Sequence, residues 1–427
     1  MKIVVINAYV RENAGDAALL AVCLRHIREA FPGAGLSIAG MEDRVLHPTF
    51  DGAENLGSIR RHVADGGVSL PRRVLRKLLV APVAMTALLL PRPACRMLLR
   101  LLPVEARREA DAVCHADLVV SMGGGYLLAR PGLDGYQNVF FVLLPALLAQ
   151  KARVPVVFAP QSYGPFPAAV QRRLVGRVLR RAALVLARED VSVELLEDCG
   201  VPAGQIRRAV DAGFAFAPEP TVDWRSRFAS GGGQLVGVTA RRWLAPAEQE
   251  GYERALAATI DMLQADGARV VLIPQVTTDY LGDDDRIVER RIAGYCTSAP
   301  LRLDEQLDYR ELKGLYTECS LLIGTRFHSV IFSLTSGVPC VAIEYEHKTR
   351  GIMADLGLEE WVLPIAEVTV ARLWPLVARL RADPAAYREL LQQRIPGYVR
   401  EAEQFRELLR EAGDGRPAGR ELVRAAA

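Results

Sequence analysis

Short apolar segments recur along the chain and alternate with helix-like ones. The apolar segments are rich in valine, isoleucine and leucine and show little polar alternation, which is typical of parallel strands buried on both faces. They are "KIVVINA", "DLVVSMG", "PVVFAPQS", "LVLARE", "LVGVTA", "RVVLIPQ", "LLIGTR" and "CVAIEY". Helix-like runs between them include 17–30, 168–181, 191–199 and 247–265. The alternation predicts an α/β fold with open parallel sheets.

One break in this pattern indicates two domains. The stretch "APEPTVDWRSRFASGGGQ" contains two prolines, three consecutive glycines and no apolar periodicity, as linkers often do. We therefore expect an N-terminal Rossmann-like domain over 1–218, a linker over 219–231 and a C-terminal Rossmann-like domain over 232–385. A charged helical tail over 386–427 would pack along the first domain or the domain junction.

The composition agrees with two globular domains and excludes several functions. The 427 residues exceed the size at which single cores stop growing, and the 50% apolar content is that of a folded soluble protein. A net charge of +3 is too small to indicate a nucleic-acid partner. The 7 cysteines are scattered without a C-x-x-C pair, so we expect neither a disulfide framework nor a metal site. The start, "MKIVVINAY", reads as a strand rather than a signal peptide, which favours a cytoplasmic protein.

The segment 72–103 departs from the rest of the chain. Its sequence, "RRVLRKLLVAPVAMTALLLPRPACRMLLRLLP", is strongly apolar, and its charged positions are exclusively basic. The longest uncharged run, 78–91, is shorter than the roughly 20 residues of a membrane-spanning helix. One interpretation is a helical insertion packed on its own domain. The other is an amphipathic segment lying on a membrane surface, which would place the protein peripherally at the inner face of the membrane.

Polar and glycine residues follow most of the predicted strands. Ligands of open α/β sheets bind beyond the carboxyl ends of the strands, so these residues are site candidates. In the first half they include Asn13, Gly15, Asp16, Gly123, Gly124, Gly125, Gln161 and Arg188. In the second half they include Arg241, Gln275, Arg326, His328, Ser329, Glu344 and Lys348. Taken singly, Asp16 also fits a helix N-cap, and the three glycines also fit a structural turn.

Arg326 and His328 are the most informative of these residues. They stand where the strand "LLIGT" gives way to a helix that starts near Ser329. A helix N-terminus favours a bound anion, and an arginine can pair with two oxygens of a phosphate or carboxylate. Lys348, after the next strand, adds a positive charge, and a histidine can transfer a proton near neutral pH. The pattern predicts a ligand with phosphate and carboxylate groups; the alternative for His328 is a buried structural role.

The ordered set of motifs resembles that of the polysaccharide pyruvyl transferases. The motifs are "NAGDAAL", "SMGGGYL", "APQSYGPF", "LARED", "VDAGF", "GVTAR", "IPQ", "GTRFHS" and "GVPCVAIEYEHK". The resemblance extends from Lys2 to about Leu363 and implies two Rossmann-like domains in a GT-B-like arrangement with an inter-domain cleft. It also implies transfer of the pyruvyl unit of phosphoenolpyruvate to a sugar of an exopolysaccharide or cell-surface glycan, which forms a pyruvate ketal and releases phosphate.

The resemblance assigns roles to particular residues. It makes His328 the acid, and it matches an upstream donor-binding arginine to Arg188, with Arg241 as the alternative. The expected donor-binding set is Arg326, His328, Lys348, Arg188, Ser329 and Arg241. The expected acceptor or cleft set is Asn13, Gly15, Asp16, Gly123, Gly124, Gly125, Gln161 and Gln275. Asp16 and Glu344 are the candidate bases, and phosphoenolpyruvate is a co-substrate, so no cofactor is expected.

Two other functions fit the same scaffold. A GT-B-type glycosyltransferase using a nucleotide sugar could bind a ribose through Glu344 and Glu346, although no acidic pair is spaced for a nucleotide. A non-catalytic protein that binds a glycan or a partner would not need both Arg326 and His328. The acceptor sugar, whether it is lipid-linked or free, and the oligomeric state stay open at this level.

Overall fold

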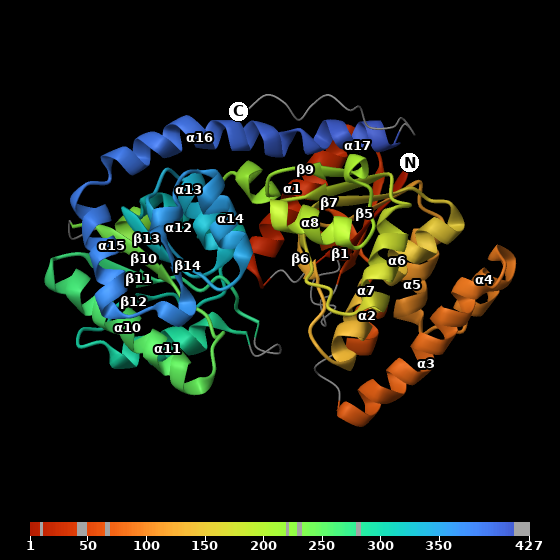
Figure 1. Ribbon diagram of the computed structural model, residues 1–427, viewed down its shortest axis with the longest axis horizontal. Coiled ribbons are helices and arrows are strands. Elements are labelled where there is room, and N and C mark those ends of the chain that lie inside the picture. Colours follow the sequence, from red (N-terminus) through yellow and green to blue (C-terminus); the bar gives the residue numbers. More distant parts are fainter. Residues whose placement is uncertain are drawn as a thin grey trace. The chain divides into compact units, whose positions relative to one another are not determined.

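The computed structural model describes residues 1–8, 12–40, 49–64, 69–218, 222–228, 233–278 and 283–413. The chain divides into two compact units (Figure 1). Unit 1 comprises the described parts of Met1–Arg11, Leu19–Ala212 and Glu401–Ala427, and unit 2 those of Glu12–Ala18 and Gly213–Arg400. Helix α1 (Ala14–Ala30) therefore begins in unit 2 and continues in unit 1.

Unit 1 is built on an open, mostly parallel sheet. The strand order is β3-β4-β2-β1-β5-β7-β8-β9, with β6 paired to β7 and only β3–β4 antiparallel among the described pairs. The strands are β1 (Lys2–Ala8), β2 (Gly35–Gly40), β3 (Thr49–Phe50), β4 (Ala53–Asn55), β5 (Leu118–Ser121), β6 (Gly124–Leu127), β7 (Val156–Tyr163), β8 (Leu184–Ala187) and β9 (Ile206–Arg208). The central strands are buried throughout, as their continuous apolar sequence predicts.

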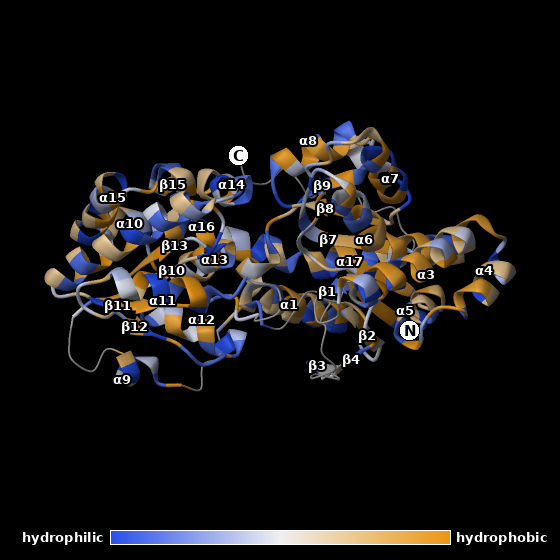
Figure 2. Cartoon of the chain, turned by 90° about the horizontal axis from the view of Figure 1, so that it is seen from below, coloured by the Kyte–Doolittle hydropathy of each residue, from blue (hydrophilic) through white to orange (hydrophobic). Residues whose placement is uncertain are grey.

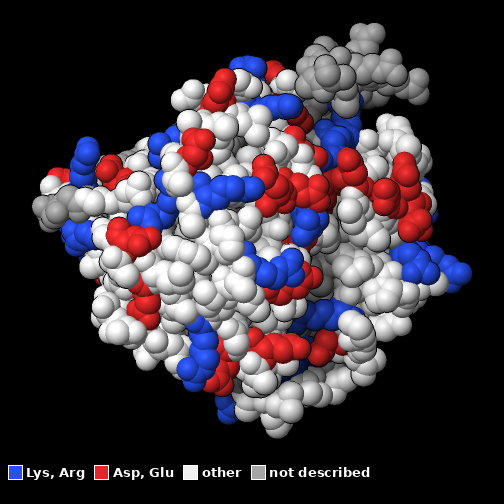
Figure 3. Space-filling model, turned by 60° about the vertical axis from the view of Figure 1, so that its left-hand side comes forward, with Lys and Arg blue, Asp and Glu red and all other residues white. Residues whose placement is uncertain are grey.

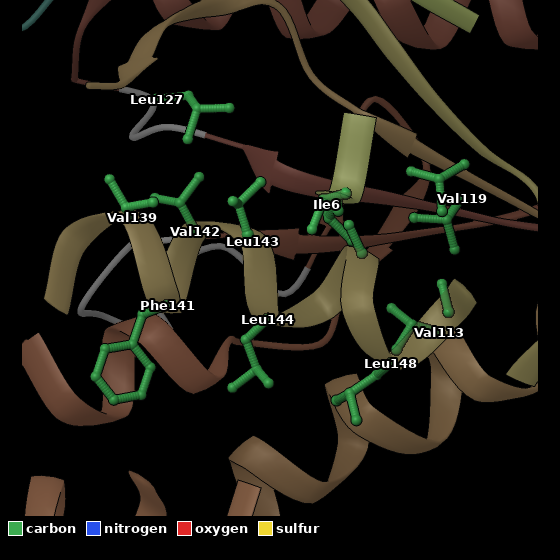
Figure 4. Packing of buried hydrophobic residues seen from close by; sticks show 14 of the residues in the cluster. Ile6, Val113, Val119, Leu127, Val139, Phe141, Val142, Leu143, Leu144 and Leu148 are labelled. Carbon is green, nitrogen blue, oxygen red and sulfur yellow. The ribbon is translucent and has the colours of Figure 1, made fainter. Parts of the chain in front are cut away.

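Helices cover this sheet, and α6 (Leu133–Ala152) lies in the hydrophobic core of unit 1. The middle of α6, over 139–149, is apolar on all sides and mostly buried, whereas its first turn is largely exposed. Figure 4 shows Val142 and Leu143 pointing toward the strands, whereas Phe141 and Leu144 point toward neighbouring helices. The other helices of unit 1 are α2 (Ile59–Ala64), α3 (Leu70–Leu89), α4 (Arg92–Leu99), α5 (Val104–Cys114), α7 (Ala169–Leu179), α8 (Asp190–Asp198), the 3-10 turns η1 (Ala203–Gln205) and η2 (Ala212–Ala215), which reaches into unit 2, and α17 (Phe405–Gly413).

Unit 2 is built on a second open sheet, whose described pairs are all parallel. The strand order is β12-β11-β10-β13-β14-β15. The strands are β10 (Leu235–Thr239), β11 (Arg269–Leu272), β12 (Leu301–Arg302), β13 (Leu321–Gly324), β14 (Cys340–Glu344) and β15 (Val362–Pro364). The helices are α9 (Trp224–Phe228), α10 (Pro246–Ala265), α11 (Asp285–Tyr295), α12 (Tyr309–Glu318), α13 (Phe327–Thr335), α14 (His347–Asp355), η3 (Glu359–Trp361), η4 (Ile365–Glu367), α15 (Val370–Ala382) and α16 (Ala385–Glu403), whose last residues belong to unit 1.

The predicted fold class is confirmed, with two Rossmann-like α/β units on open parallel sheets. The eight apolar segments form β1, β5, β7, β8, β10, β11, β13 and β14. The expected linker 219–231 differs, because α9 lies within it: Trp224 is buried, and its indole N–H donates to the carbonyl of Glu311 at 3.0 Å. Residues 219–221 and 229–231 lie outside the described residues, as do 414–427 of the tail.

The segment 72–103 forms α3, α4 and the turn that leads to α5. The inner sides of α3 and α4 join the core of unit 1 through Val80, Ala84, Ala87, Cys95 and Leu99. Within the described part of the chain, no helix combines the length and the apolar character needed to cross a bilayer. The segment is therefore packed on its own unit along one side, as the first interpretation expected.

Candidate functional site

The N-terminus of α13 carries the arginine and histidine that the sequence singled out. Strand β13 ends at Gly324, and Arg326 is the N-cap residue in an extended conformation. The buried hydroxyl of Ser329 donates to the carbonyl of Arg326 at 2.6 Å and lies 2.8 Å from the hydroxyl of Thr239. Thr239 in turn accepts the backbone N–H of Thr325 at 2.9 Å. Ser329, expected to bind the donor, is thus bonded within the protein and holds the backbone of the turn.

The guanidinium of Arg326 is paired with two aspartates, contrary to the expectation of an open anion-binding fork. Its Nε lies 3.0 Å from Oδ1 of Asp285, and its Nη2 lies 2.9 Å from Oδ1 of Asp283. Arg326 is only 7% exposed, and such a buried charge requires a counter-charge. Burial lowers the pKa of Arg326, but Asp285 and Asp283 outweigh this effect and raise the pKa, so the side chain stays charged.

Asp285 also fixes the loop that follows β11. Its Oδ2 accepts the backbone N–H groups of Gln275 and Val276, each at 3.0 Å. The amide of Gln275 is buried and donates to the hydroxyl of Tyr316, so this predicted cleft residue faces the interior. Our sequence reasoning missed Asp283 and Asp285, although the run "DDD" after a predicted strand was a visible signal.

The segment 12–16 pairs with the same loop. The backbone N–H of Ala14 donates to the carbonyl of Gln275 at 2.9 Å, and that of Thr277 donates to the carbonyl of Glu12 at 3.0 Å. Asn13 caps α1, because its Oδ1 accepts the backbone N–H groups of Gly15 and Asp16. Asn13 Nδ2 also donates to Oδ2 of Asp16 at 2.6 Å. The N-cap is therefore Asn13 and not Asp16, and the Asp16 carboxylate is held beside it.

This pairing brings Gly15 against His328. A β-carbon at position 15 would lie 2.1 Å from Nδ1 and 2.4 Å from Cγ of the imidazole, so only glycine fits here without displacing the ring. The N-termini of α1 and α13, which are far apart in the sequence, thus meet in unit 2. This part of the predicted site is assembled within one unit.

Two half-buried cations lie close to this position in the fold, around Tyr345. The guanidinium of Arg241 lies 4.1 Å from the ring centre of Tyr345 and 4.7 Å from that of Trp243. Lys348 Nζ lies 5.5 Å from the ring centre of Tyr345 and 2.7 Å from a carboxylate oxygen of Glu346. Burial raises the pKa of Glu346, but Lys348 and Arg241 outweigh it and lower the pKa. The side chain of Arg241 is 11% exposed and lies 3.7 Å from Asp283, and the side chain of Lys348 is 15% exposed.

Glu344, one of the two candidate bases, is engaged by a neighbouring arginine. Its Oε2 accepts from Nε of Arg350 at 2.9 Å and lies 2.8 Å from Nη2 of the same guanidinium. Burial lowers the pKa of Arg350, but Glu344 and Glu359 raise it overall. Both candidate bases are thus bonded within the protein, Glu344 to Arg350 and Asp16 to Asn13.

Arg188 lies in a buried polar network of unit 1. It is 2% exposed, donates to Asp211, and donates to the hydroxyl of Ser162 at 2.7 Å. Ser162 in turn donates to Glu189 at 3.0 Å. Arg188, which we expected to contact the donor, is thus bound to groups of its own unit. Its counter-charge, Asp211, lies 23 residues later in the sequence and compensates for the burial of the guanidinium.

The glycines 123–125 and Gln161 lie in or next to strands β6 and β7 of the sheet in unit 1. A β-carbon on Gly123 would lie 2.5 Å from the carbonyl oxygen of Pro160, and Gly124 has a φ of +145°. Gly124 pairs with Gln161 between β6 and β7, and Gly125 follows it in β6. Gln161 is buried, and its Nε2 donates to the hydroxyl of Tyr163 at 3.0 Å. The structural alternative for the glycines therefore applies to Gly123 and Gly124.

Among the described residues, no group of three or more histidine, cysteine, aspartate or glutamate side chains is arranged to hold a metal ion. The seven cysteines are all free thiols.

Comparison with solved structures defines the class of fold. The chain is similar to a UDP-GlcNAc 2-epimerase from Neisseria meningitidis bound to UDP-GlcNAc, with a TM-score of 0.60, 12% identity, and 96% of this chain and 99% of the other covered. It is also similar to Alr3699/HepE from Anabaena in complex with UDP and glucose, with a TM-score of 0.55, 14% identity, and 97% and 100% coverage. At these identities the similarity defines a GT-B-like fold and does not indicate which reaction the protein catalyses.

The family is defined by the sequence. The chain belongs to the polysaccharide pyruvyl transferase family, whose model matches residues 13–347. The amylovoran biosynthesis protein AmsJ of Erwinia amylovora is 29% identical over 308 residues, which cover 68% of this chain and 71% of that protein. The resemblance found in the ordered motifs is confirmed, and the matched region contains both Arg326 and His328.

Proposed function

We propose that this protein transfers the pyruvyl unit of phosphoenolpyruvate to two hydroxyls of one sugar in an exopolysaccharide or other cell-surface glycan. The observation that carries the proposal is the position of His328 against Gly15, with Lys348 and Arg241 around Tyr345 in the same unit. An acid and two cations are the groups that a phosphorylated enol requires. Family membership supports the same reaction.

In the first step, His328 gives a proton to the methylene carbon of phosphoenolpyruvate. That carbon becomes a methyl group, and the neighbouring C2 becomes electrophilic. A sugar hydroxyl then forms a C–O bond to C2 and loses its proton to a base, for which we take Asp16, the neighbour of Gly15 in the chain. General acid catalysis of this kind contributes roughly 10²–10⁴-fold in rate.

In the second step, another hydroxyl of the same sugar bonds to C2, and the C2–O bond to phosphate breaks. The proton of this second hydroxyl passes to His328, and the proton that Asp16 took from the first hydroxyl passes to the departing phosphate, so both side chains end in their starting protonation states. Lys348 and Arg241 would bind the donor's phosphate and carboxylate and stabilise the charge on the leaving phosphate. Arg326 would act mainly by positioning, because Asp283 and Asp285 already use its guanidinium.

The test is a reaction of the full-length protein with phosphoenolpyruvate and a panel of glycan acceptors. Phosphate release and the methyl proton signal of a ketal should appear together and only with a competent acceptor. His328→Ala should abolish both signals while leaving the protein folded. Transfer from a nucleotide sugar, with no consumption of phosphoenolpyruvate, would overturn the proposal in favour of a glycosyltransferase.

A further inference from the structure

The outer sides of α3 and α4 expose large apolar side chains to solvent. Ten of the seventeen strongly exposed large hydrophobic residues in the described part of the chain lie between Leu70 and Val104. They are 46–86% exposed and comprise Leu70, Val74, Leu75, Leu78, Leu79, Met85, Leu89, Met97, Leu101 and Val104. Contiguous apolar patches of this kind are rare on monomeric soluble proteins and mark interaction or membrane sites. We call these ten residues the outer apolar face.

Helix α3 has two apolar sides, of which only one is covered. Spacings of four and seven residues place Leu70, Val74, Leu78, Met85 and Leu89 on one side of the helix. The opposite side, with its three buried residues, packs in the core of unit 1. Figure 2 shows hydrophobic colour along much of α3, at the edge of unit 1. Packing in the core of unit 1 therefore explains the apolar residues on the inner side of α3 but not those on its outer side.

The charged residues within the segment that carries the outer apolar face all have one sign. The charged residues between 70 and 104 are Arg72, Arg73, Arg76, Lys77, Arg92, Arg96 and Arg100, and the first acidic residue is Glu105. Lys77, Arg76 and Arg92 also bond to neighbouring groups of unit 1, whereas Arg72, Arg96 and Arg100 are exposed. On the molecular face in Figure 3, by contrast, acidic and basic side chains are interspersed.

We propose that the outer apolar face binds the surface of an anionic lipid bilayer, independently of the reaction that the protein catalyses. Helices that combine an apolar side with lysine and arginine insert their apolar side chains at the boundary between headgroups and acyl chains. Basic side chains next to the membrane add attraction to anionic headgroups. A second copy of the chain is a poorer occupant, because pairing two such faces would bring arginines of like charge together.

The test is co-sedimentation of the full-length protein with vesicles. At low salt, the protein should pellet with vesicles that contain phosphatidylglycerol and remain largely in the supernatant with phosphatidylcholine alone. Leu75→Gln with Leu78→Gln should reduce the bound fraction at least about tenfold, and Arg96→Ala should weaken binding by up to roughly fivefold. Added salt should weaken binding of the wild type, because exposed charges are screened.

Matched controls separate this surface from others. Val170→Gln and Arg173→Ala change exposed residues of α7, outside the outer apolar face, and should leave vesicle binding unchanged. An unchanged melting temperature would show that each variant is folded. The proposal is overturned if the protein ignores anionic vesicles at low salt, or if it binds neutral and anionic vesicles equally. It is also overturned if Leu75→Gln with Leu78→Gln abolishes only self-association and leaves vesicle binding intact. None of these outcomes depends on phosphoenolpyruvate.

Discussion

Gly15 lies directly against the imidazole of His328, and a β-carbon at position 15 would approach its Nδ1 to 2.1 Å. Two hydrogen bonds to Asn13 Oδ1 and the pairing of residues 12–14 with the loop after β11 hold Gly15 in place. The ring of His328 cannot yield easily, because the clash would include its Cβ at 2.6 Å as well as the ring atoms. Gly15 therefore sets the position of the proposed acid.

Gly15→Ala should reduce turnover by about 100-fold, because a catalytic group displaced by about 1 Å loses that much rate. The measurement is kcat in a phosphate-release assay with phosphoenolpyruvate. Gly251→Ala is the control, since nothing lies within 4 Å of a β-carbon at that position in α10. Wild-type turnover in Gly15→Ala would show that His328 does not need its present position.

His328→Gln should lower kcat by at least about 100-fold, because glutamine cannot supply the proton that the donor methylene takes up. Binding of phosphoenolpyruvate, measured by calorimetry, should change little, since Lys348 and Arg241 remain. A folded variant with near-normal turnover would remove His328 from the acid role. If the variant bound phosphoenolpyruvate poorly but turned over the bound donor at the normal rate, His328 would be a donor-binding residue instead.

Arg326→Lys should mainly lower the stability of the folded protein. A lysine keeps the charge but cannot reproduce the multiple bonds to Asp285 and Asp283, so the cost should be a part of the about 3–5 kcal/mol that follows removal of one partner of a buried ion pair. We expect a melting temperature several degrees below that of the wild type. Arg290→Lys is the control, because the Arg290 side chain is 56% exposed and its pair with Asp304 is long at 3.9 Å. An unchanged melting temperature together with a strongly weakened donor affinity would indicate that Arg326 binds the donor directly.

Lys348→Ala should raise the KM for phosphoenolpyruvate by about 10-fold or more, because charge-assisted hydrogen bonds contribute about 1.5–3 kcal/mol. Glu346→Gln removes the carboxylate that Lys348 contacts at 2.7 Å but keeps the cation, so it should leave KM unchanged or lower it. Steady-state kinetics of both variants and of Arg241→Lys will measure this. Unchanged KM in Lys348→Ala and Arg241→Lys alike would place the anion site elsewhere.

The strands were predictable because their signal is local. Strands buried on both faces, such as β1 and β13, need continuous apolar segments, and these are visible without knowledge of their neighbours. The short edge strands β9, β12 and β15 contain two or three residues and leave almost no pattern. Helix α9 was missed for a related reason, because two aromatic anchors and not a periodic side hold it in place.

The roles of polar residues were less predictable, because burial and counter-charges come from tertiary packing. Arg326 follows a strand, as an anion-binding residue would, but its partner Asp285 lies 41 residues earlier in the sequence. The position of Glu344 likewise gives no sign of its bond to Arg350. The meeting of Gly15 and His328 depends on the pairing of residues 12–14 with the loop after β11. A sequence places such residues at strand ends but does not show which of them neutralise each other.

Glu109 should make stability fall as pH rises. It is 1% exposed in α5, and its Oε2 accepts the backbone N–H of Ile59 at 2.5 Å. Burial raises the pKa of Glu109 from 4.5 to about 7, although the bond to Ile59 opposes this. Between these values the folded protein holds a proton that the unfolded chain has lost, so the contribution of Glu109 to stability is full below about pH 4.5 and is lost as pH rises through about 7.

Glu109→Gln keeps an oxygen acceptor for Ile59 and cannot ionise. Relative to the wild type, this variant should therefore gain stability between about pH 5 and about pH 8, by on the order of 3 kcal/mol. Melting temperatures of both proteins across this range will measure the gain. Glu54→Gln, at an exposed position of β4, should show no such trend and controls for loss of a surface charge. A constant difference between Glu109→Gln and the wild type at all pH values would mean that Glu109 is already ionised in the folded protein.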